Sequence, residues 1–237
     1  MHIENLSCTQ TFSVMRIAIN RLYLVLLIFM ISTYTYGQTS LNIGYTNTIT
    51  QKSSATLNQS SKNRINGVSA SLAYDFTFLK LFGFNIGLGY TYSFDREGDG
   101  GNDKFTGYKT NYHTLDIPIR LMVNIPFSDK SKAFVFAGPR ATFDISGTIQ
   151  PYLAGEKIGD LINIYGDKEI STIEDIKELN PKRLNILAGA GVGLKLDHFI
   201  IRGGYDLGLI DINKDDASEN IYKLRKNMWY ITLGIAL

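Results

Sequence analysis

Charged residues of both signs recur at alternate positions of segments that are otherwise apolar or small. Carboxylates in such a setting could act as general acid and general base, which requires a cavity for a substrate. They could instead pair with the basic residues and fill the interior of a narrow barrel, because a buried charge needs a partner of opposite sign. We expect this structural role and predict no catalytic residue. The charges concerned are Asp116, Arg120, Arg140, Asp144, Lys195, Arg202 and Asp206.

Histidine offers a second kind of chemistry. Enzymes that modify the acyl chains of lipopolysaccharide on small barrels need a serine and a histidine close together near the membrane. Beyond residue 37 the sequence has two histidines, His113 and His198, and His198 falls in a predicted turn. His113 is flanked by Asn111 and Thr114, and its neighbours in sequence include no identifiable nucleophile, so we expect it to be structural.

Two acidic segments, at 95–103 and 211–219, present oxygen ligands at alternate positions, as calcium loops do. The first lacks the bidentate glutamate of such loops, since Thr106 stands at the twelfth position. We expect ordinary turn chemistry in water at both segments, although divalent cations that bridge lipopolysaccharide could bind there. Phosphate-binding, dinucleotide, zinc and nucleophile-elbow motifs are not present. The sequence therefore predicts no metal site and no cofactor.

Composition excludes several classes of protein. Of the 237 residues 19% are charged and 12% aromatic, whereas disordered chains are highly charged and poor in aromatics. A formal net charge of +2 gives no broad basic field for nucleic acid. The single cysteine, Cys8, excludes a disulfide framework.

The N-terminus has the pattern of a secretory signal. An apolar run at 22–31 is too short to cross a bilayer as a helix, which takes about 20 residues. Arg16 and Arg21 precede it and small or polar residues follow, which predicts cleavage after Gly37. We therefore expect a signal peptide at 1–37 and one domain at 38–237.

Translation could also begin at Met15, in which case residues 1–14 are a misassigned start. Cys8 precedes the apolar run instead of following it, which disfavours a lipid anchor.

The elements that must position these charges are β-strands, because side chains alternate with a period of two along most of the remaining chain. Around residues 84–94, for example, apolar side chains alternate with glycine and small polar ones. This periodicity predicts eight strands, at 39–50, 65–76, 83–95, 108–125, 133–147, 183–196, 199–211 and 227–237.

The connections between these strands alternate strictly between short and long. Long ones fall at 51–64, 96–107, 148–182 and 212–226, and short ones at 77–82, 126–132 and 197–198. An up-and-down antiparallel barrel places alternate connections at opposite ends, so all long loops share one end. The longest, 148–182, could hold a helix at about 172–179, which Ser171 and Glu174 would cap, or a further hairpin that raises the count to ten strands.

Strand composition favours a membrane barrel over a soluble one. The second face of the strands carries glycines and charges, which suits a filled lumen, whereas a soluble barrel would leave these glycines in water. Aromatic residues gather near both ends of the predicted strands, as in the girdles of outer-membrane barrels. We predict an all-β, eight-stranded antiparallel transmembrane barrel with both termini in the periplasm and the long loops outside.

Three segments resemble the outer-membrane β-barrel domain of Bacteroidetes, whose members are described as PorT-like or porin-family proteins. They are Leu115–Leu121, Phe136–Arg140 and the predicted hairpin Gly189–Leu209. The resemblance covers about 40–237 and implies a small OmpX-like barrel in the outer membrane with an accessory role in protein secretion. The terminal residue, Leu237, departs from the aromatic residue common in such barrels.

We expect a non-enzymatic scaffold or binding protein that acts through its long loops. Its expected partners are outer-membrane lipid, lipopolysaccharide and another envelope protein, and not nucleic acid. Two alternatives remain open at the level of sequence: a narrow channel for small solutes, and a lipid A-modifying enzyme that depends on His113.

Overall fold

The computed structural model describes six stretches of the chain, 35–54, 60–78, 81–99, 106–165, 181–213 and 222–237. Most of the predicted signal peptide, residues 1–34, lies outside the described residues, as does the helix predicted at about 172–179. The first strand begins at Thr35, so the predicted cleavage site after Gly37 falls within it.

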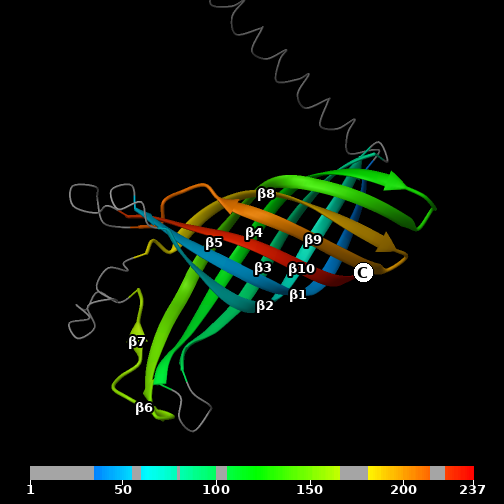
Figure 1. Ribbon diagram of the computed structural model, residues 1–237. Helices are drawn as coiled ribbons and strands as arrows, with labels where there is room; N and C mark the ends of the chain where they lie inside the picture. Colours follow the sequence, from blue (N-terminus) through cyan, green and yellow to red (C-terminus); the bar gives the residue numbers. More distant parts are fainter. Residues whose placement is uncertain (1–34, 55–59, 79–80, 100–105, 166–180, 214–221) are drawn as a thin grey trace, which may run out of the picture.

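Eight long strands form a closed antiparallel ring, which confirms the predicted up-and-down barrel (Figure 1). Each strand pairs with its neighbours along the chain, and the pairing of the first with the last, from Ser40↔Ala236 to Ser54↔Tyr222, closes the ring. A closed ring removes the unpaired edges that an open sheet would expose. The strands are β1 (Thr35–Ser54), β2 (Ser60–Phe78), β3 (Phe82–Asp99), β4 (Thr106–Pro126), β5 (Ser131–Leu153), β8 (Leu184–Leu196), β9 (Phe199–Gly208) and β10 (Tyr222–Ala236).

Two short strands lie outside the ring beside the far end of β5. β6 (Glu156–Lys157) and β7 (Ile162–Asn163) both pair with β5 where it has run past its partner β8. With them the sheet has ten strands, which is the alternative number that the sequence left open. They extend one side of the barrel along its axis and do not add strands to the ring.

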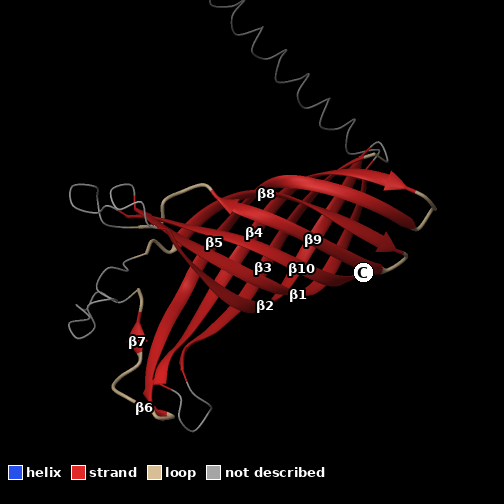
Figure 2. Cartoon of the chain, viewed as in Figure 1, coloured by secondary structure: helices blue, strands red, loops and turns tan. Residues whose placement is uncertain are grey.

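Several strands extend further than the sequence predicted, mostly toward the long loops, although β1 also begins earlier, at Thr35, and β2 ends later, at Phe78. The segments 51–54, 60–64, 96–99 and 148–153 were predicted as loop and are paired strand. The first three segments have no apolar face, so the alternation that marks a half-buried strand is missing from them, and the fourth contains Pro151, which argues against a strand. As a result β3, β4 and β5 run past the ring toward β6 and β7 (Figures 1 and 2). In the opposite direction, β9 ends at Gly208, short of the predicted 211.

The barrel is apolar on the outside and polar on the inside. Leu121 and Val192 point outward with 66% and 62% of their surface exposed, whereas Asn124 and Asp206 are completely buried in the lumen. This is the reverse of a soluble protein and is the arrangement expected where lipid surrounds the sheet. The described residues contain no helix that is long and apolar enough to cross a membrane.

Inward-facing glycines make room for large luminal side chains. A Cβ atom at Gly189 would overlap the Asp206 carboxylate, and one at Gly191 would overlap the ring of Phe136. Toward the short turns, the lumen holds an apolar cluster that includes Met122 and Phe134. The lumen is therefore a packed core that combines apolar and charged layers.

Candidate functional site

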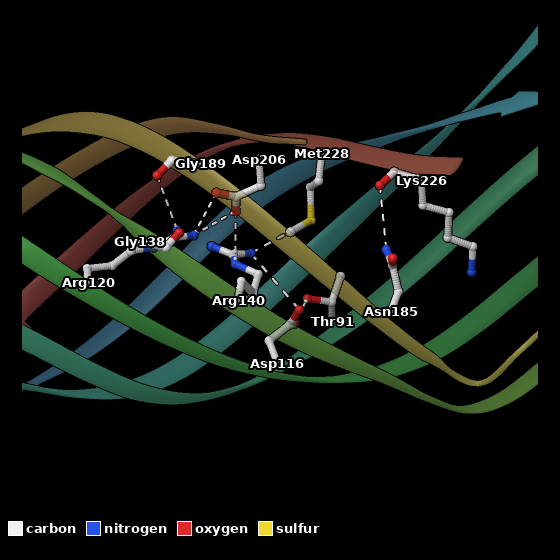
Figure 3. A network of polar contacts seen from close by, with 10 residues as sticks. All are labelled: Thr91, Asp116, Arg120, Gly138, Arg140, Asn185, Gly189, Asp206, Lys226 and Met228. Atoms are coloured by element: carbon white, nitrogen blue, oxygen red, sulfur yellow. Dashed lines mark hydrogen bonds and ion pairs between the residues drawn. The ribbon is translucent and has the colours of Figure 1, made fainter. Parts of the chain in front are cut away.

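A cluster of two arginines and two aspartates crosses the middle of the lumen (Figure 3). Arg120 Nη2 donates to both carboxylate oxygens of Asp206, at 2.7 and 2.8 Å. Arg140 Nε lies 3.0 Å from Asp206 Oδ2, and Arg140 Nη1 lies 4.0 Å from Asp116 Oδ1. Thr91 Oγ1 donates to Asp116 Oδ2 at 2.6 Å. Each carboxylate therefore faces a guanidinium group, as burial of charge requires.

Backbone and aromatic groups complete the coordination of the two guanidinium groups. Arg120 Nη1 donates to the carbonyl oxygen of Gly138, which adopts a φ of 153°. The guanidinium carbon of Arg140 lies 4.4 Å from the centre of the Tyr230 ring, in a cation–π contact. These contacts hold both guanidinium groups in fixed positions between the strands.

A second ion pair lies in the half of the lumen nearer the short turns. Arg202 Nη2 donates to Asp75 Oδ2 at 2.6 Å, and Arg202 Nη1 donates to Asn42 Oδ1 at 2.7 Å. Asn85 Nδ2 donates to the other oxygen of Asp75 at 2.5 Å. Lys195 is placed further toward the turns, where its ammonium group donates to the Gln38 side-chain oxygen.

A third cluster, in the half nearer the long loops, ties the 154–165 segment to the barrel wall. Asp144 accepts from Lys226 Nζ at 2.5 Å, from Tyr165 Oη at 2.5 Å and from Thr114 Oγ1 at 2.7 Å. Burial, followed by the neighbouring Asp144 carboxylate, raises the pKa of Tyr165 above its ordinary value. The Tyr165 hydroxyl therefore keeps its proton and serves as a hydrogen-bond donor.

The structure thus brings together four of the seven charges singled out from the sequence, Asp116, Arg120, Arg140 and Asp206. Asp144, Arg202 and Lys195 also face the lumen, but in separate clusters on either side. Sequence analysis missed two of their partners. Asp75 lies at an inward position of a strand that was predicted, so the alternation would have identified it, whereas Lys226 lies in the part of β10 that the prediction cut short.

Two small cavities lie in the interior of the lumen. One of about 40 Å³ lies between the central cluster and Asp144, and one of about 70 Å³ lies between that cluster and Arg202. A water molecule occupies about 30 Å³ in the liquid. Asp116 lines the first cavity, and Arg120 and Arg140 line the second, so the central cluster lies between them.

His113 lies outside the lumen, in a group of aromatic rings on the outer surface. Its Nδ1 atom is 2.5 Å from Tyr90 Oη, and its ring centre is 5.1 Å from that of Tyr92. Strand register places Ser146 directly opposite His113, beside a bulge in the β4–β5 pairing. Sequence analysis found no nucleophile beside His113 because Ser146 comes close through strand pairing alone.

Among the described residues, no group of three or more histidine, cysteine, aspartate and glutamate side chains is placed to hold a metal ion. Parts of both acidic segments considered from the sequence, 100–103 and 214–219, lie outside the described residues.

A comparison with protein families decides the class of the chain. Residues 35–214 match the model described as outer membrane protein beta-barrel domain. The chain belongs to this family. The outer-membrane location predicted from the sequence is thereby confirmed, and the family resemblance is confirmed at the level of this outer-membrane barrel domain. The sequence matches none of the curated proteins with which it was compared.

Solved structures similar to this outer membrane beta-barrel protein are also small barrels. Ail, the attachment invasion locus protein of Yersinia pestis, in complex with the heparin analogue sucrose octasulfate, is 11% identical with a TM-score of 0.43, over 85% of this chain and 99% of that chain. Neisserial surface protein A is 11% identical with a TM-score of 0.35, over 82% and 96%. The outer membrane enzyme PagL is 13% identical with a TM-score of 0.39, over 80% and 98%.

Proposed function

We propose that this outer-membrane barrel is a non-enzymatic scaffold that binds another component of the cell envelope or an external ligand. The binding region is the sheet that β3, β4 and β5 extend beyond the ring, together with β6 and β7, which we call the sheet extension. In this proposal both termini and the short turns face the periplasm, and the sheet extension lies outside the cell.

The length of the strands carries the proposal. A strand needs about 9–11 residues to cross the outer membrane. β8 and β9 have 13 and 10 residues, β1, β2 and β3 have 20, 19 and 18, and β4 and β5 are the longest with 21 and 23. Strands β3, β4 and β5 stay paired with one another beyond Phe143, the last β5 residue that pairs with β8, so they project there as a paired sheet. Binding sites on rigid elements hold their geometry better than sites on loops.

The edge of the sheet extension supports protein binding. β2 pairs with β3 as far as Phe94, and in the described part of the chain the strand partner of β3 at Glu97 and Asp99 is β4 alone. An unpaired edge offers backbone donors and acceptors to a further strand. Large apolar side chains are also exposed near this end, at Leu153, Ile158 and Leu161. A partner could add a strand to the edge of β3 and cover these apolar side chains, so that neither stays exposed.

The filled lumen supports a scaffold in preference to a channel. Small-solute passage would require the central ion pairs between Arg120, Arg140 and Asp206 to separate, and breaking a buried pair is strongly unfavourable. The PorT-like resemblance of the sequence further favours a partner from the protein secretion apparatus.

Site-specific crosslinking tests the proposal. A photoreactive amino acid in place of Glu97 or Leu161 samples the sheet extension, and the same residue in place of Leu121 samples the lipid-facing wall as a matched control. We expect crosslinks to one protein or surface ligand from Glu97 and Leu161, and none from Leu121. A protein that purifies alone from mildly solubilised membranes and gives no crosslink at either position would overturn the proposal.

The lipid A-modifying alternative has its own test at His113. Replacing it with alanine, or Ser146 with alanine, should leave the lipid A acylation pattern measured by mass spectrometry unchanged. Loss of an acylation change in both variants, with the barrel still folded, would favour the enzyme over the scaffold.

A further inference from the structure

The lumen opens at its turn end into a cavity of about 640 Å³, far larger than the two cavities of the interior. The loop at 127–130 between β4 and β5 forms one side of this mouth. Side chains from three other places in the barrel face it, on β1, β2 and β8. They include Gln38, Asp75, Thr77 and Lys195, and β5 adds Lys132.

Two lysines lie directly opposite each other in this mouth. Lys132 of β5 and Lys195 of β8 are register partners, and both occupy inward positions with half-buried side chains. Like charges directly opposite each other on neighbouring strands destabilise a sheet. The repulsion is strengthened here because the wall of the barrel removes part of the water that would screen it.

Neither lysine has a carboxylate partner among the described residues. Lys195 donates to the amide oxygen of Gln38, and Lys132 Nζ lies 3.5 Å from Thr77 Oγ1, a long contact. Two carboxylates also line the mouth. Arg202 and Asn85 occupy the two oxygens of Asp75, at 2.6 and 2.5 Å, and Asp129 lies in the turn beside Lys130.

We propose that the turn-end mouth is an anion site that takes a phosphate group, held between the ammonium groups of Lys132 and Lys195. Each ammonium group carries three donors, and charge-assisted bonds to phosphate oxygens are among the strongest hydrogen bonds in proteins. A bound phosphate group removes the repulsion between the two strands and uses donors that now contact neutral oxygens. The phosphate group comes either from a lipid headgroup of the facing leaflet or from free phosphate.

This site is independent of the sheet extension, which lies at the other end of the barrel (Figure 1). Its test can therefore fail without affecting the proposed scaffold function, and the reverse also holds.

Binding is measured on the protein purified from outer membranes in a non-ionic detergent. The probe is inorganic phosphate, followed by calorimetry and by the temperature of unfolding. A second arm reconstitutes the protein into vesicles of phosphatidylcholine alone or with added phosphatidylglycerol, and measures protection of Lys132 and Lys195 from acetylation. The variants are Lys132→Gln and Lys195→Gln, and the matched control is Lys157→Gln, an exposed lysine in β6 at the opposite end.

We expect phosphate to raise the unfolding temperature of the wild type and of Lys157→Gln, and each mouth variant to weaken phosphate binding about tenfold or more. In buffer without phosphate or other multivalent anions, Lys132→Gln and Lys195→Gln should unfold no earlier than the wild type, because each removes a repulsion. If Lys132 and Lys195 had only a structural role, each Gln variant would unfold at a lower temperature than the wild type in that buffer.

The two arms separate the sources of the phosphate group. Binding of inorganic phosphate in detergent supports a free anion, and protection only in vesicles with phosphatidylglycerol supports a lipid headgroup. No phosphate effect in detergent together with equal acetylation in both kinds of vesicle would overturn the proposal. Equal binding by Lys132→Gln, Lys195→Gln and the wild type would overturn it as well.

Discussion

Arg120 of β4 and Asp206 of β9 meet across the lumen, although 86 residues separate them in sequence. Strands β5 and β8 lie between β4 and β9 around the ring, so this bond spans the interior and is not a contact along the wall. Both side chains are buried, with 3% and 0% of their surface exposed. The pair therefore links β4 to β9 through the interior of the barrel and should stabilise the closed ring.

Removal of Asp206 should weaken the barrel strongly. Asp206→Asn leaves Arg120 and Arg140 buried without their shared carboxylate, which we expect to lower the free energy of unfolding by about 3–5 kcal/mol. Urea unfolding in detergent micelles measures this loss. Asp197→Asn is the control, because Asp197 is exposed and lies 3.9 Å from its partner Lys130. Equal urea midpoints for Asp206→Asn and Asp197→Asn would show that the Arg120–Asp206 pair does not stabilise the barrel.

Conductance should appear only when the central cluster is removed. We expect the wild type to be silent in planar bilayers, because Arg140 and its partners separate the cavities of about 40 and 70 Å³. The double variant Arg120→Ala, Arg140→Ala should join these cavities and conduct cations past Asp116 and Asp206. A gel shift between unheated and boiled samples checks that the variant is folded. Stepwise currents through the wild type would favour the channel.

A charged side chain on the outer wall should lower the folding stability only where lipid surrounds the barrel. Leu121→Arg places a cation on the lipid-facing surface and should cost about 2–4 kcal/mol near the bilayer midplane. Leu161→Arg is a close control, since Leu161 is exposed to a similar degree but lies between β6 and β7 in the sheet extension. Folding into lipid vesicles over a urea series compares the two. Equal losses would contradict the proposed position of the membrane.

The hydroxyl of Tyr165 should hold the 154–165 segment against the barrel. Tyr165→Phe removes its hydrogen bond to Asp144, which we expect to cost about 1.5–3 kcal/mol because the acceptor is charged. The loss should show as faster amide hydrogen exchange in β6 and β7, with exchange in β8 and β9 unchanged. Unaltered exchange throughout would mean that backbone pairing to β5 alone holds the segment.

Surface labelling should reveal the orientation. Lys157→Cys in the sheet extension and Ser128→Cys in the β4–β5 turn lie at opposite ends of the barrel. A membrane-impermeant maleimide added to intact cells should label Lys157→Cys, and should label Ser128→Cys after lysis alone. The reverse pattern would invert the proposed topology.

Much of the fold was predictable from the sequence, and the errors lie mainly at the strand ends. The strand at 108–125 was placed to within two residues at each end, because Leu115 to Val123 alternate with luminal residues. The strand at 133–147 was cut short by six residues at its end, since β5 continues to Leu153 through Pro151, a residue that argues against a strand. Period-two alternation reports the contrast between lipid and lumen, and it vanishes where a strand leaves the membrane.

By itself, the sequence determined the all-β class, the number of ring strands, their order and which side chains face the lumen. Each of these depends on alternation within one strand or on the length of one connection, and both are local properties of the chain. Only the tertiary structure decided which luminal charges meet. Arg120 reaches Asp206, Lys132 faces Lys195 and Ser146 faces His113 because of strand register and the closure of the ring. A shift of register would leave the alternation intact in each strand and change every one of these partners.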